Sequence, residues 1–391
     1  MSRHIGKRSE SHRLSDIDAV VLAGTGGSAP FETESGKIHK PYLEFAGEPL
    51  VLHVVKAVMG SRRVRRVYVV GDVSDLTQAL APVGFNDMGN KLKIVGQMGN
   101  LVQNCLGTFF DHIMVDRALP QARGIWNDAA AVTRFVQENP SVRTTGVLVV
   151  TSDLPFLAVQ DVDSFLEKIP PGSSLCAGLC DHLELVKMQE VLGNETVLDR
   201  WKLGAIPIRS RQVRWNNLWF VRPLMAHPGL YNLLQDVYSH RYLLNSDGKV
   251  RWQNWWAIIR AVANYGFRVR GVAKFARGFF NLAGMMLASG LARWAHKAGA
   301  FFAWPFRTVL GKRDLEFVAS LVLGVKTDLL IGGKVAPAVD IDVPESYMAL
   351  ACHGEENYRR VLRYLGRDLS ADGDGSRAQG LGLKIIAGGK N

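Results

Sequence analysis

A glycine-rich loop near the N-terminus contains the residue types that bind phosphate groups. Gly24, Gly26 and Gly27 come at the end of an apolar run at residues 19–23, and Lys40 follows a short distance later. Glycines let backbone N–H groups approach an anion closely, and a lysine offsets its charge. The spacing is neither that of a P-loop, which requires Gly-Lys-Ser/Thr, nor Gly-x-Gly-x-x-Gly. Taken alone, the loop is either a phosphate-binding loop or a flexible turn.

An aspartate follows a second apolar run of strand length. Asp153 comes shortly after residues 147–150 and before Pro155, which blocks continuation into a helix. This order places the carboxylate at the rim of a predicted sheet. The common alternative for a single aspartate is a helix cap or a turn residue, and the local sequence does not decide between them.

Apolar runs of strand length alternate with longer helical patterns, and these are the elements that must position the loop and the aspartate. The predicted strand and helix pairs are 19–23 with 50–59, 67–70 with 76–80, 92–95 with 101–114, and 147–150 with 159–166. This alternation predicts an α/β fold with a Rossmann-like, mixed and mainly parallel sheet covered by helices on both faces. Ligands bind such sheets beyond the carboxyl ends of the strands, where the loop and Asp153 both fall.

The composition is that of a globular protein with an anionic partner. The chain has 391 residues, of which 47% are hydrophobic, and this excludes a disordered protein. A net charge of +11 favours nucleotides, nucleic acid or acidic lipid head groups as partners. The N-terminus lacks the apolar core of a signal peptide, and the four cysteines are too few and too scattered for a disulfide framework. We therefore expect a cytoplasmic protein with buried, reduced thiols.

Changes in composition predict the domain boundaries. Residues 1–16 are expected to form a disordered basic tail, and residues 366–391 a flexible tail. One α/β domain is expected at 17–365, interrupted by a helical insertion at 225–312.

The predicted insertion is rich in Trp and Arg, and it has two possible interpretations. Residues 279–292 contain no charge, but the run is shorter than the roughly 20 residues needed to span a bilayer. Apolar helices flanked by Arg, Lys and Trp fit a segment that lies in a membrane interface. Residues 251–313 therefore either contact an acidic membrane surface, or pack as a helical subdomain on the core or on another subunit.

The glycine loop is the first of several motifs that occur in a specific order. Residues 22–29 read Leu-Ala-Gly-Thr-Gly-Gly-Ser-Ala, Lys40-Pro41 follows, and residues 46–53 read Ala-Gly-Glu-Pro-Leu-Val-Leu-His. This order resembles the nucleotidyltransferase superfamily of sugar-phosphate pyrophosphorylases and MobA-like NTP transferases. The matching segments extend from about residue 19 to residue 350. The resemblance implies the nucleotide-diphospho-sugar transferase fold, which is GT-A-like.

The loop departs from the family pattern at two positions. Thr25 stands where many relatives carry glycine, and Ala29 stands where they carry an arginine that neutralises the nucleotide's phosphates. Loss of this charge-assisted contact is expected to weaken triphosphate binding, or to leave the task to Lys37, Lys40 or another basic residue.

The resemblance also implies which residues bind the substrates. The implied nucleotide-binding residues are Leu22, Ala23, Gly24, Thr25, Gly26, Gly27, Ser28, Lys40, Gln97 and Asn100. Gln97 offers a donor and an acceptor to the edge of a base, whereas Asn100 either contacts the nucleotide or caps the next helix. In residues 213–223, which alternate like a strand, Asn216 or Asn217 is implied to contact the acceptor.

A magnesium site is implied in the same way. Asp153 matches the family's metal ligand, and a second ligand is implied within the Val-Asp-Ile-Asp-Val stretch, where Asp342 is the closest match and Asp340 its possible partner. Alternation predicts both aspartates on one face of a short strand. Mg²⁺ keeps several waters and needs few protein carboxylates. Lys40, Asp153 and Asp342 are the implied catalytic residues.

The reaction implied is attack by the phosphate of an acceptor on a nucleoside triphosphate, with release of pyrophosphate. The implied partners are CTP, GTP or UTP and a phosphorylated small molecule, such as a sugar, polyol or head-group phosphate, and not a nucleic acid. Two alternatives stay open. One is a GT-A glycosyltransferase that uses nucleotide sugars, which the triphosphate loop argues against. The other is a catalytically degenerate, membrane-associated scaffold that binds nucleotide, which Ala29 favours and the aspartates oppose.

Overall fold

The computed structural model describes residues 16–24, 30–33, 36–83, 91–192, 206–208, 211–227, 229–240, 251–265, 284, 291, 311–332, 335–341, 344–351 and 354–367. Most of the two predicted tails, and most of the predicted insertion after residue 265, lie outside these residues.

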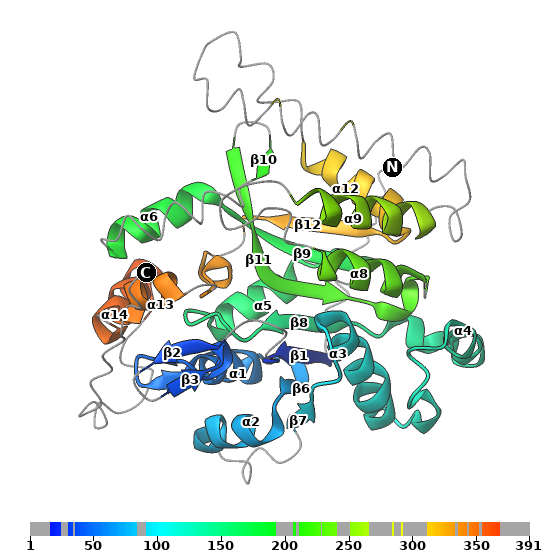
Figure 1. Cartoon of the computed structure of the whole chain (residues 1–391), viewed down its shortest axis with the longest axis horizontal. Helices are drawn as coiled ribbons and strands as arrows, with labels where there is room; N and C mark the ends of the chain where they lie inside the picture. Colours follow the sequence, from blue (N-terminus) through cyan, green and yellow to red (C-terminus); the bar gives the residue numbers. More distant parts are fainter. Residues whose placement is uncertain are drawn as a thin grey trace, which may run out of the picture.

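A central sheet organises the fold (Figure 1). Its strands are β1 (Ile17–Leu22), β6 (Val64–Gly71), β7 (Leu92–Gly96), β8 (Val147–Thr151), β9 (Leu175–Asp181), β10 (Ile206–Ile208), β11 (Arg211–Val221) and β12 (Thr327–Ile331). Their order is β12-β9-β11-β8-β1-β6-β7, and β10 pairs with β11. Strand β11 runs antiparallel to β8, β9 and β10, whereas the other pairs are parallel. The predicted mixed, mainly parallel sheet is confirmed.

Helices cover the sheet, and short hairpins and turns join its strands. The α-helices are α1 (Leu50–Gly60), α2 (Val73–Ala79), α3 (Leu101–Gly107), α4 (Ala129–Glu138), α5 (Val159–Glu167), α6 (His182–Leu192), α8 (Gly229–Ser239), α9 (Trp252–Tyr265), α12 (Lys312–Leu323), α13 (Pro344–Ala351) and α14 (Gly354–Tyr364). The short helices are η1 (Lys40–Tyr42), η2 (Ala81–Val83), the π-helix η3 (Thr108–Met114), η4 (Pro120–Ala122), η5 (Pro140–Thr144), η6 (Pro223–Met225) and η9 (Ala336–Ala338). Two hairpins pair β2 (Phe31–Thr33) with β3 (Gly36–Ile38) and β4 (Glu44–Phe45) with β5 (Glu48–Pro49).

The two faces of the sheet have separate apolar cores, because successive side chains of a strand point to opposite faces. On one face Val21 packs in a cluster with residues of α1 and α5. On the other face Val20 and Tyr68 pack with residues of α3, η3, α4 and α8. Both faces of β1 are therefore buried, as expected for a central strand of a parallel sheet.

The C-terminal helices extend the core at the carboxyl edge of the sheet. Helix α14 packs against α6, and both orange helices, α13 and α14, lie beside α6 in Figure 1. Tyr347 of α13 donates its hydroxyl to the carbonyl oxygen of Glu44 over 2.8 Å. Phe45, Phe156 and Ile341 share the apolar cluster beneath these helices. The end of the described chain is thereby attached to the loops that follow β1 and β8.

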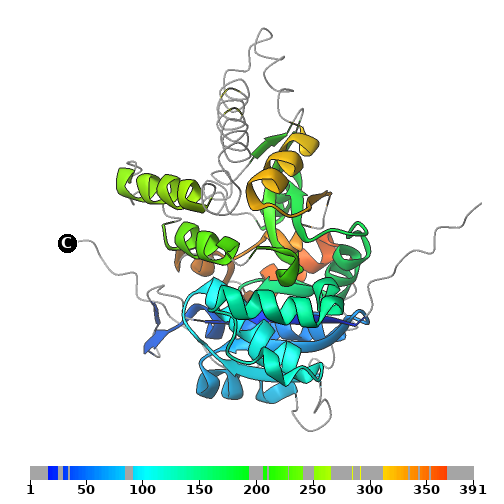
Figure 2. The same cartoon turned by 90° about the vertical axis from the view of Figure 1, so that its right-hand side faces the viewer.

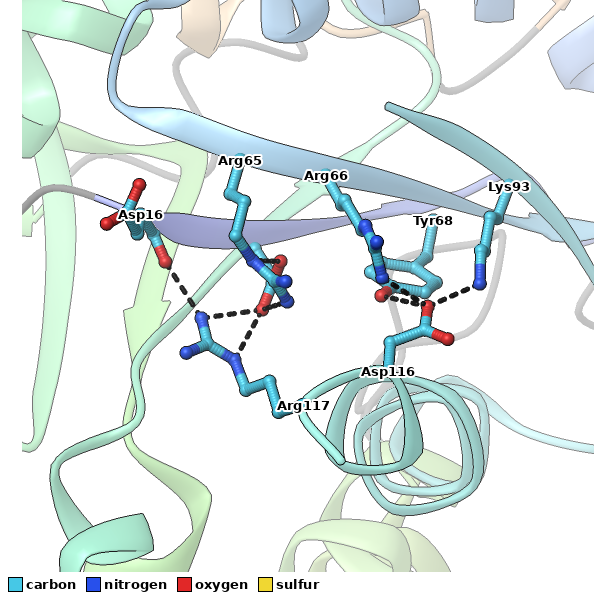
Figure 3. Close-up of polar contacts among 8 residues, drawn as sticks. Asp16, Arg65, Arg66, Tyr68, Lys93, Asp116 and Arg117 are labelled. Carbon is cyan, nitrogen blue, oxygen red and sulfur yellow. Dashed lines mark hydrogen bonds and ion pairs between the residues drawn. The ribbon is translucent and has the colours of Figure 1, made fainter. Parts of the chain in front are cut away.

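A network of charged side chains closes the opposite, amino edge of the sheet (Figure 3). Asp18 has no exposed surface and accepts hydrogen bonds from Arg65 at 3.0 and 2.8 Å and from Arg117 at 2.9 Å. A second carboxylate, Asp116, accepts from Lys93 at 2.5 Å and from the Tyr68 hydroxyl at 2.7 Å. This network joins β1, β6 and β7 to the end of η3, far along each strand from the glycine loop.

The predicted insertion begins as helices. Helices α8 and α9 stack on each other (Figure 2, green) through Leu230, Leu233, Ala261 and Tyr265. Within the described residues, no helix is both long enough and apolar enough to cross a membrane.

Candidate active site

The carboxyl ends of the central strands bring the first motif and the aspartate loop together. The N–H of Ala23 donates to the carbonyl oxygen of Val70 over 2.8 Å, and the N–H of Ser152 donates to the carbonyl oxygen of Leu22 over 3.1 Å. The loops after β1 and β8 therefore start side by side. Leu22, Ala23 and Gly24 are described, whereas Thr25, Gly26, Gly27, Ser28 and Ala29 lie outside the described residues.

Gln97 lies against the start of the glycine loop. A β-carbon built on Gly24 would lie 3.0 Å from Gln97 Oε1 and 3.4 Å from Asn104 Nδ2, so glycine permits this close approach. The N–H of Gln97 donates to the carbonyl oxygen of Gly71 over 3.1 Å, which continues the β6–β7 pairing. Two predicted nucleotide-binding residues are thus neighbours.

Asn100 caps α3. Its side chain accepts the N–H of Gln103 at 3.0 Å, and the Gln103 side chain accepts the N–H of Asn100 at 2.9 Å. This reciprocal pair is a capping box, so the capping interpretation of Asn100 is confirmed. A contact between Asn100 and a nucleotide stays a prediction.

Asn104 is a residue that the sequence analysis missed. It is 4% exposed, accepts the N–H of Met98 at 2.6 Å and donates to the carbonyl oxygen of Gly99 at 3.3 Å. Asn104 therefore holds the turn that carries Gln97. The signal was a polar residue on the otherwise apolar inner face of the predicted helix 101–114.

Lys40 and Asp153 form an ion pair. Lys40 is the first residue of η1, and its ammonium group contacts Asp153 Oδ2. The side chains are 18% and 9% exposed. Asp153 Oδ1 is buried and has no hydrogen-bond partner among the described residues. The structure thus brings together two predicted catalytic residues, and one carboxylate oxygen is left unused.

The segment before Asp342 lies next to Asp153. The N–H of Ile341 donates to the carbonyl oxygen of Asp153 over 3.2 Å. Asp340 accepts a hydrogen bond from Arg214 Nη2 at 3.0 Å and one from Asn217 Nδ2 at 3.3 Å. Asp340 and Asn217, predicted for different roles, are therefore in direct contact.

The predicted short strand through Asp340 is wrong. Residues 336–338 form the 3₁₀ helix η9, and residues 339–341 belong to no strand. Pro337 favours the turn because it lacks an N–H, and the Ile341 N–H bonds to the loop after β8. Asp342 lies outside the described residues, so its predicted place beside Asp340 stays a prediction.

Asn216 and Asn217 have different surroundings. Asn216 is 2% exposed, accepts the N–H of Leu218 at 3.2 Å, and covers Gly178, where a β-carbon would lie 2.1 Å from Asn216 Oδ1. It lines a cavity of about 190 Å³ between α5 and the sheet. Of the two predicted acceptor contacts, Asn217 is the one that reaches Asp340.

Arg214 is a second residue that the sequence analysis missed. Its side chain is 14% exposed and pairs with Asp340, yet its Nη1 is buried and has no partner among the described residues. It lies opposite Cys180 in the β9–β11 pairing. The signal was a cation within the strand pattern, only a few residues before the two asparagines.

Cys180 lies on β9 opposite Arg214. Burial raises the pKa of Cys180 to about 12, although Arg214 acts in the opposite direction. The Cys180 thiol therefore stays protonated at neutral pH.

The residues present fit a magnesium ion held by few protein ligands. Asp153 Oδ1 is a buried oxygen without a hydrogen-bond partner in the described part of the chain, and such an oxygen suits a metal. Both oxygens of Asp340 accept hydrogen bonds from β11. Among the described residues there is no cluster of three or more His, Cys, Asp and Glu side chains that could hold a metal. Mg²⁺, which also binds phosphate and water oxygens, does not require one.

Residues 19–184 match the family described as the MobA-like NTP transferase domain. No curated protein matches the chain.

Three solved structures match the chain at low identity. The first is a hypothetical transferase from Thermus thermophilus, which is 19% identical, with 85% of this chain and 99% of that chain covered and a TM-score of 0.42. The second is a CMP:2-keto-3-deoxy-manno-octonic acid synthetase complexed with CTP, which is 15% identical, with 64% of this chain and 87% of that chain covered and a TM-score of 0.31. The third is a nucleotidyl transferase from Methanothermobacter thermautotroptrophicus, which is 12% identical, with 89% of this chain and 99% of that chain covered and a TM-score of 0.36.

Proposed function

Because the chain is a nucleotidyltransferase with a MobA-like NTP transferase domain at residues 19–184, we propose that it joins a nucleoside triphosphate to a phosphorylated small molecule and releases pyrophosphate, in a Mg²⁺-dependent reaction. CTP, GTP and UTP are the candidate nucleotides. The acceptor is a sugar phosphate, a polyol phosphate or a phosphorylated head group.

One observation carries this proposal: the ion pair between Lys40 and Asp153 beside the start of the glycine loop. A partly buried lysine at the carboxyl edge of the sheet suits the phosphates of a nucleotide. The Oδ1 of Asp153, which has no hydrogen-bond partner among the described residues, suits Mg²⁺. Asp342 is the proposed second ligand, with Asp340 next to it in the same segment.

The chain's own residues have distinct tasks in the proposed reaction. Gln97 hydrogen-bonds the edge of the base, and backbone N–H groups of residues 24–28 bind the phosphates. Lys40 neutralises charge on the phosphates, and Asn217 contacts the acceptor. A phosphate monoester is nucleophilic at neutral pH, so positioning and charge neutralisation suffice without a general base. When bound, Mg²⁺ stabilises charge that develops on the attacked phosphate.

Nucleotide binding and pyrophosphate release test the proposal together. The wild-type chain is expected to show a higher melting temperature with Mg²⁺ and one of CTP, GTP or UTP, because a ligand that binds the folded state stabilises it. Asp153→Ala is expected to abolish pyrophosphate release while the far-ultraviolet circular dichroism spectrum stays unchanged. Asp236→Asn, a change at an exposed position of α8, is the matched control. Full turnover by Asp153→Ala would reject the metal assignment.

We also propose that the α/β domain spans 17–365, and that its insertion at 225–312 contacts the inner, acidic face of a membrane from the cytoplasm. On α9, Trp252, Trp256 and Ile259 are 69%, 67% and 38% exposed. They recur at helical spacing on one face, and Arg251 and Arg260 are exposed nearby. Exposed Trp with flanking Arg suits the interface of an acidic bilayer.

Liposome flotation tests this membrane contact. The chain is expected to float with vesicles that contain phosphatidylserine and not with neutral phosphatidylcholine vesicles. A Trp252→Ser/Trp256→Ser variant should stay at the bottom of the gradient, whereas Val73→Ser, at an exposed apolar position remote in sequence, should float. Equal flotation of the double variant and the wild type would contradict the contact.

A further inference from the structure

Two pairs of opposite charges lie next to each other at the carboxyl edge of the sheet. Lys40 pairs with Asp153, and Arg214 pairs with Asp340. The hydrogen bond from Ile341 to Asp153 joins the two pairs. Lys40 has a task on the nucleotide side of the proposed reaction. Arg214, a guanidinium at the same edge, has no task yet.

The proposed chemistry needs a cation on the acceptor side as well. An acceptor phosphate and the attacked phosphate are both anionic, and they repel each other as they approach. Fixed cations remove this repulsion without reorganisation during the reaction. Arginine is suited to this task, because its planar fork of donors matches the oxygens of a phosphate.

We propose that Arg214 binds the phosphate of the acceptor, and that Asp340 and Asn217 hold its guanidinium in place. This inference rests on the proposed nucleotidyl transfer. Asp340 accepts from Nη2 at 3.0 Å and from Asn217 at 3.3 Å, so the carboxylate is fixed between two side chains of β11. Asp340 is then a positioning residue for Arg214.

The unused donor of Arg214 is the second line of support. Nη1 is buried and has no acceptor within the described residues. Buried donors in folded proteins are nearly always paired, and an unpaired one is destabilising. We infer that its acceptor is an oxygen of the bound ligand, which the fixed guanidinium meets without moving.

A neighbouring arginine provides a matched control. Arg211 begins the same strand, but its side chain is 55% exposed and its guanidinium is 3.8 Å from Asp181. An exposed cation at this distance from its partner contributes little. Arg211→Gln therefore removes one positive charge from β11, as Arg214→Gln does, but it leaves the pair between Arg214 and Asp340 intact.

The experiment compares wild type, Arg214→Gln, Arg214→Lys and Arg211→Gln. Titration calorimetry measures the binding of sn-glycerol 3-phosphate, inorganic phosphate and glycerol, each in the presence of Mg²⁺ and a non-hydrolysable α,β-methylene nucleotide. We expect Arg214→Gln to bind both phosphates about tenfold to a hundredfold more weakly. Arg214→Lys should be intermediate, since it keeps the charge but loses the fork, and Arg211→Gln should match wild type. The nucleotide-induced melting shift should be the same in all four proteins.

Several outcomes would overturn the inference. The first is that Arg214→Gln binds both phosphates as tightly as wild type. The second is that wild type binds glycerol with the same affinity as sn-glycerol 3-phosphate. The third is that wild type binds neither phosphate. If Arg214→Gln does not fold, Arg214→Lys decides, and wild-type affinity in that variant rejects the role. Absence of any nucleotide-induced shift in wild type would instead reject the proposed function, and the inference with it.

Discussion

Ile341 donates its backbone N–H to the carbonyl oxygen of Asp153 over 3.2 Å, although 187 residues separate them in the sequence (positions 154–340). This bond joins the loop after β8 to the segment that follows η9. It brings Asp340, with Arg214 and Asn217, beside the pair formed by Lys40 and Asp153. The candidate site is therefore assembled from the first, middle and last parts of the chain.

The pair between Lys40 and Asp153 predicts competition between the lysine and a divalent cation. Both would use the same carboxylate, so Lys40→Met should raise the affinity for Mn²⁺ about fivefold or more without nucleotide, because an uncompensated carboxylate attracts a cation more strongly. The same variant should bind nucleotide more weakly. Electron paramagnetic resonance of Mn²⁺ measures the first effect, and thermal shift the second.

Lys56→Met is the control for this prediction. Lys56 also pairs with a carboxylate, that of Glu48, but the two side chains are 48% and 33% exposed. Its removal should leave both affinities unchanged. Equal or weaker Mn²⁺ binding by Lys40→Met would show that the lysine and the metal do not share Asp153.

The position of Gln97 beside the start of the glycine loop predicts a role in base selectivity. Gln97→Ala should reduce the difference between the preferred and the poorest of CTP, GTP and UTP by about tenfold, since a hydrogen-bonding site loses its discrimination when its polar group is removed. The ratio of kcat/KM values measures this, with Gln78→Ala, at an exposed position on α2, as control. An unchanged ratio would remove Gln97 from base recognition.

The sheet could be predicted because its signals are local. Strands of five or six apolar residues, such as the one with Val20 and Val21, need only alternation with helical patterns to be recognised. The family motifs identified Lys40 and Asp153 as site residues. These two side chains meet because the loops that carry them converge at the carboxyl edge of the sheet.

The contacts among Arg214, Asn217 and Asp340 could not be predicted, because they depend on tertiary packing. The register of β11 against β9 shifts between Trp215 and Trp219, whose rings stack at 5.4 Å. Such a shift changes which side chain faces which surface, so alternation could not separate Asn216 from Asn217. The approach of Asp340 to Arg214 depends on the long-range attachment of the C-terminal helices, which no local pattern encodes.

Asp18 should be important for stability and not for ligand binding. Its side chain has no exposed surface and pairs with Arg65 and Arg117 at the amino edge of the sheet, opposite the candidate site. Asp18→Asn leaves two arginines without their partner, which we expect to lower the free energy of unfolding by about 2–4 kcal/mol. Urea denaturation measures the loss, with Asp236→Asn as control. A decrease below about 0.5 kcal/mol, which is usual for surface changes, would contradict the structural role.

Asp116 should make the free energy of unfolding depend on pH in the acid range. Burial opposes ionisation, but hydrogen bonds from Lys93 and Tyr68 dominate and lower the pKa of Asp116 below its ordinary value of 3.8. A carboxylate whose pKa is lower in the folded state stabilises the protein above its unfolded pKa, and this contribution is lost as the pH falls through the folded pKa. Asp116→Asn should therefore be less stable than wild type at pH 7, and the difference should shrink below about pH 4. Urea denaturation of both proteins at a series of pH values measures this; a difference that stays constant down to pH 2 would mean that the loss comes from packing and not from the charge.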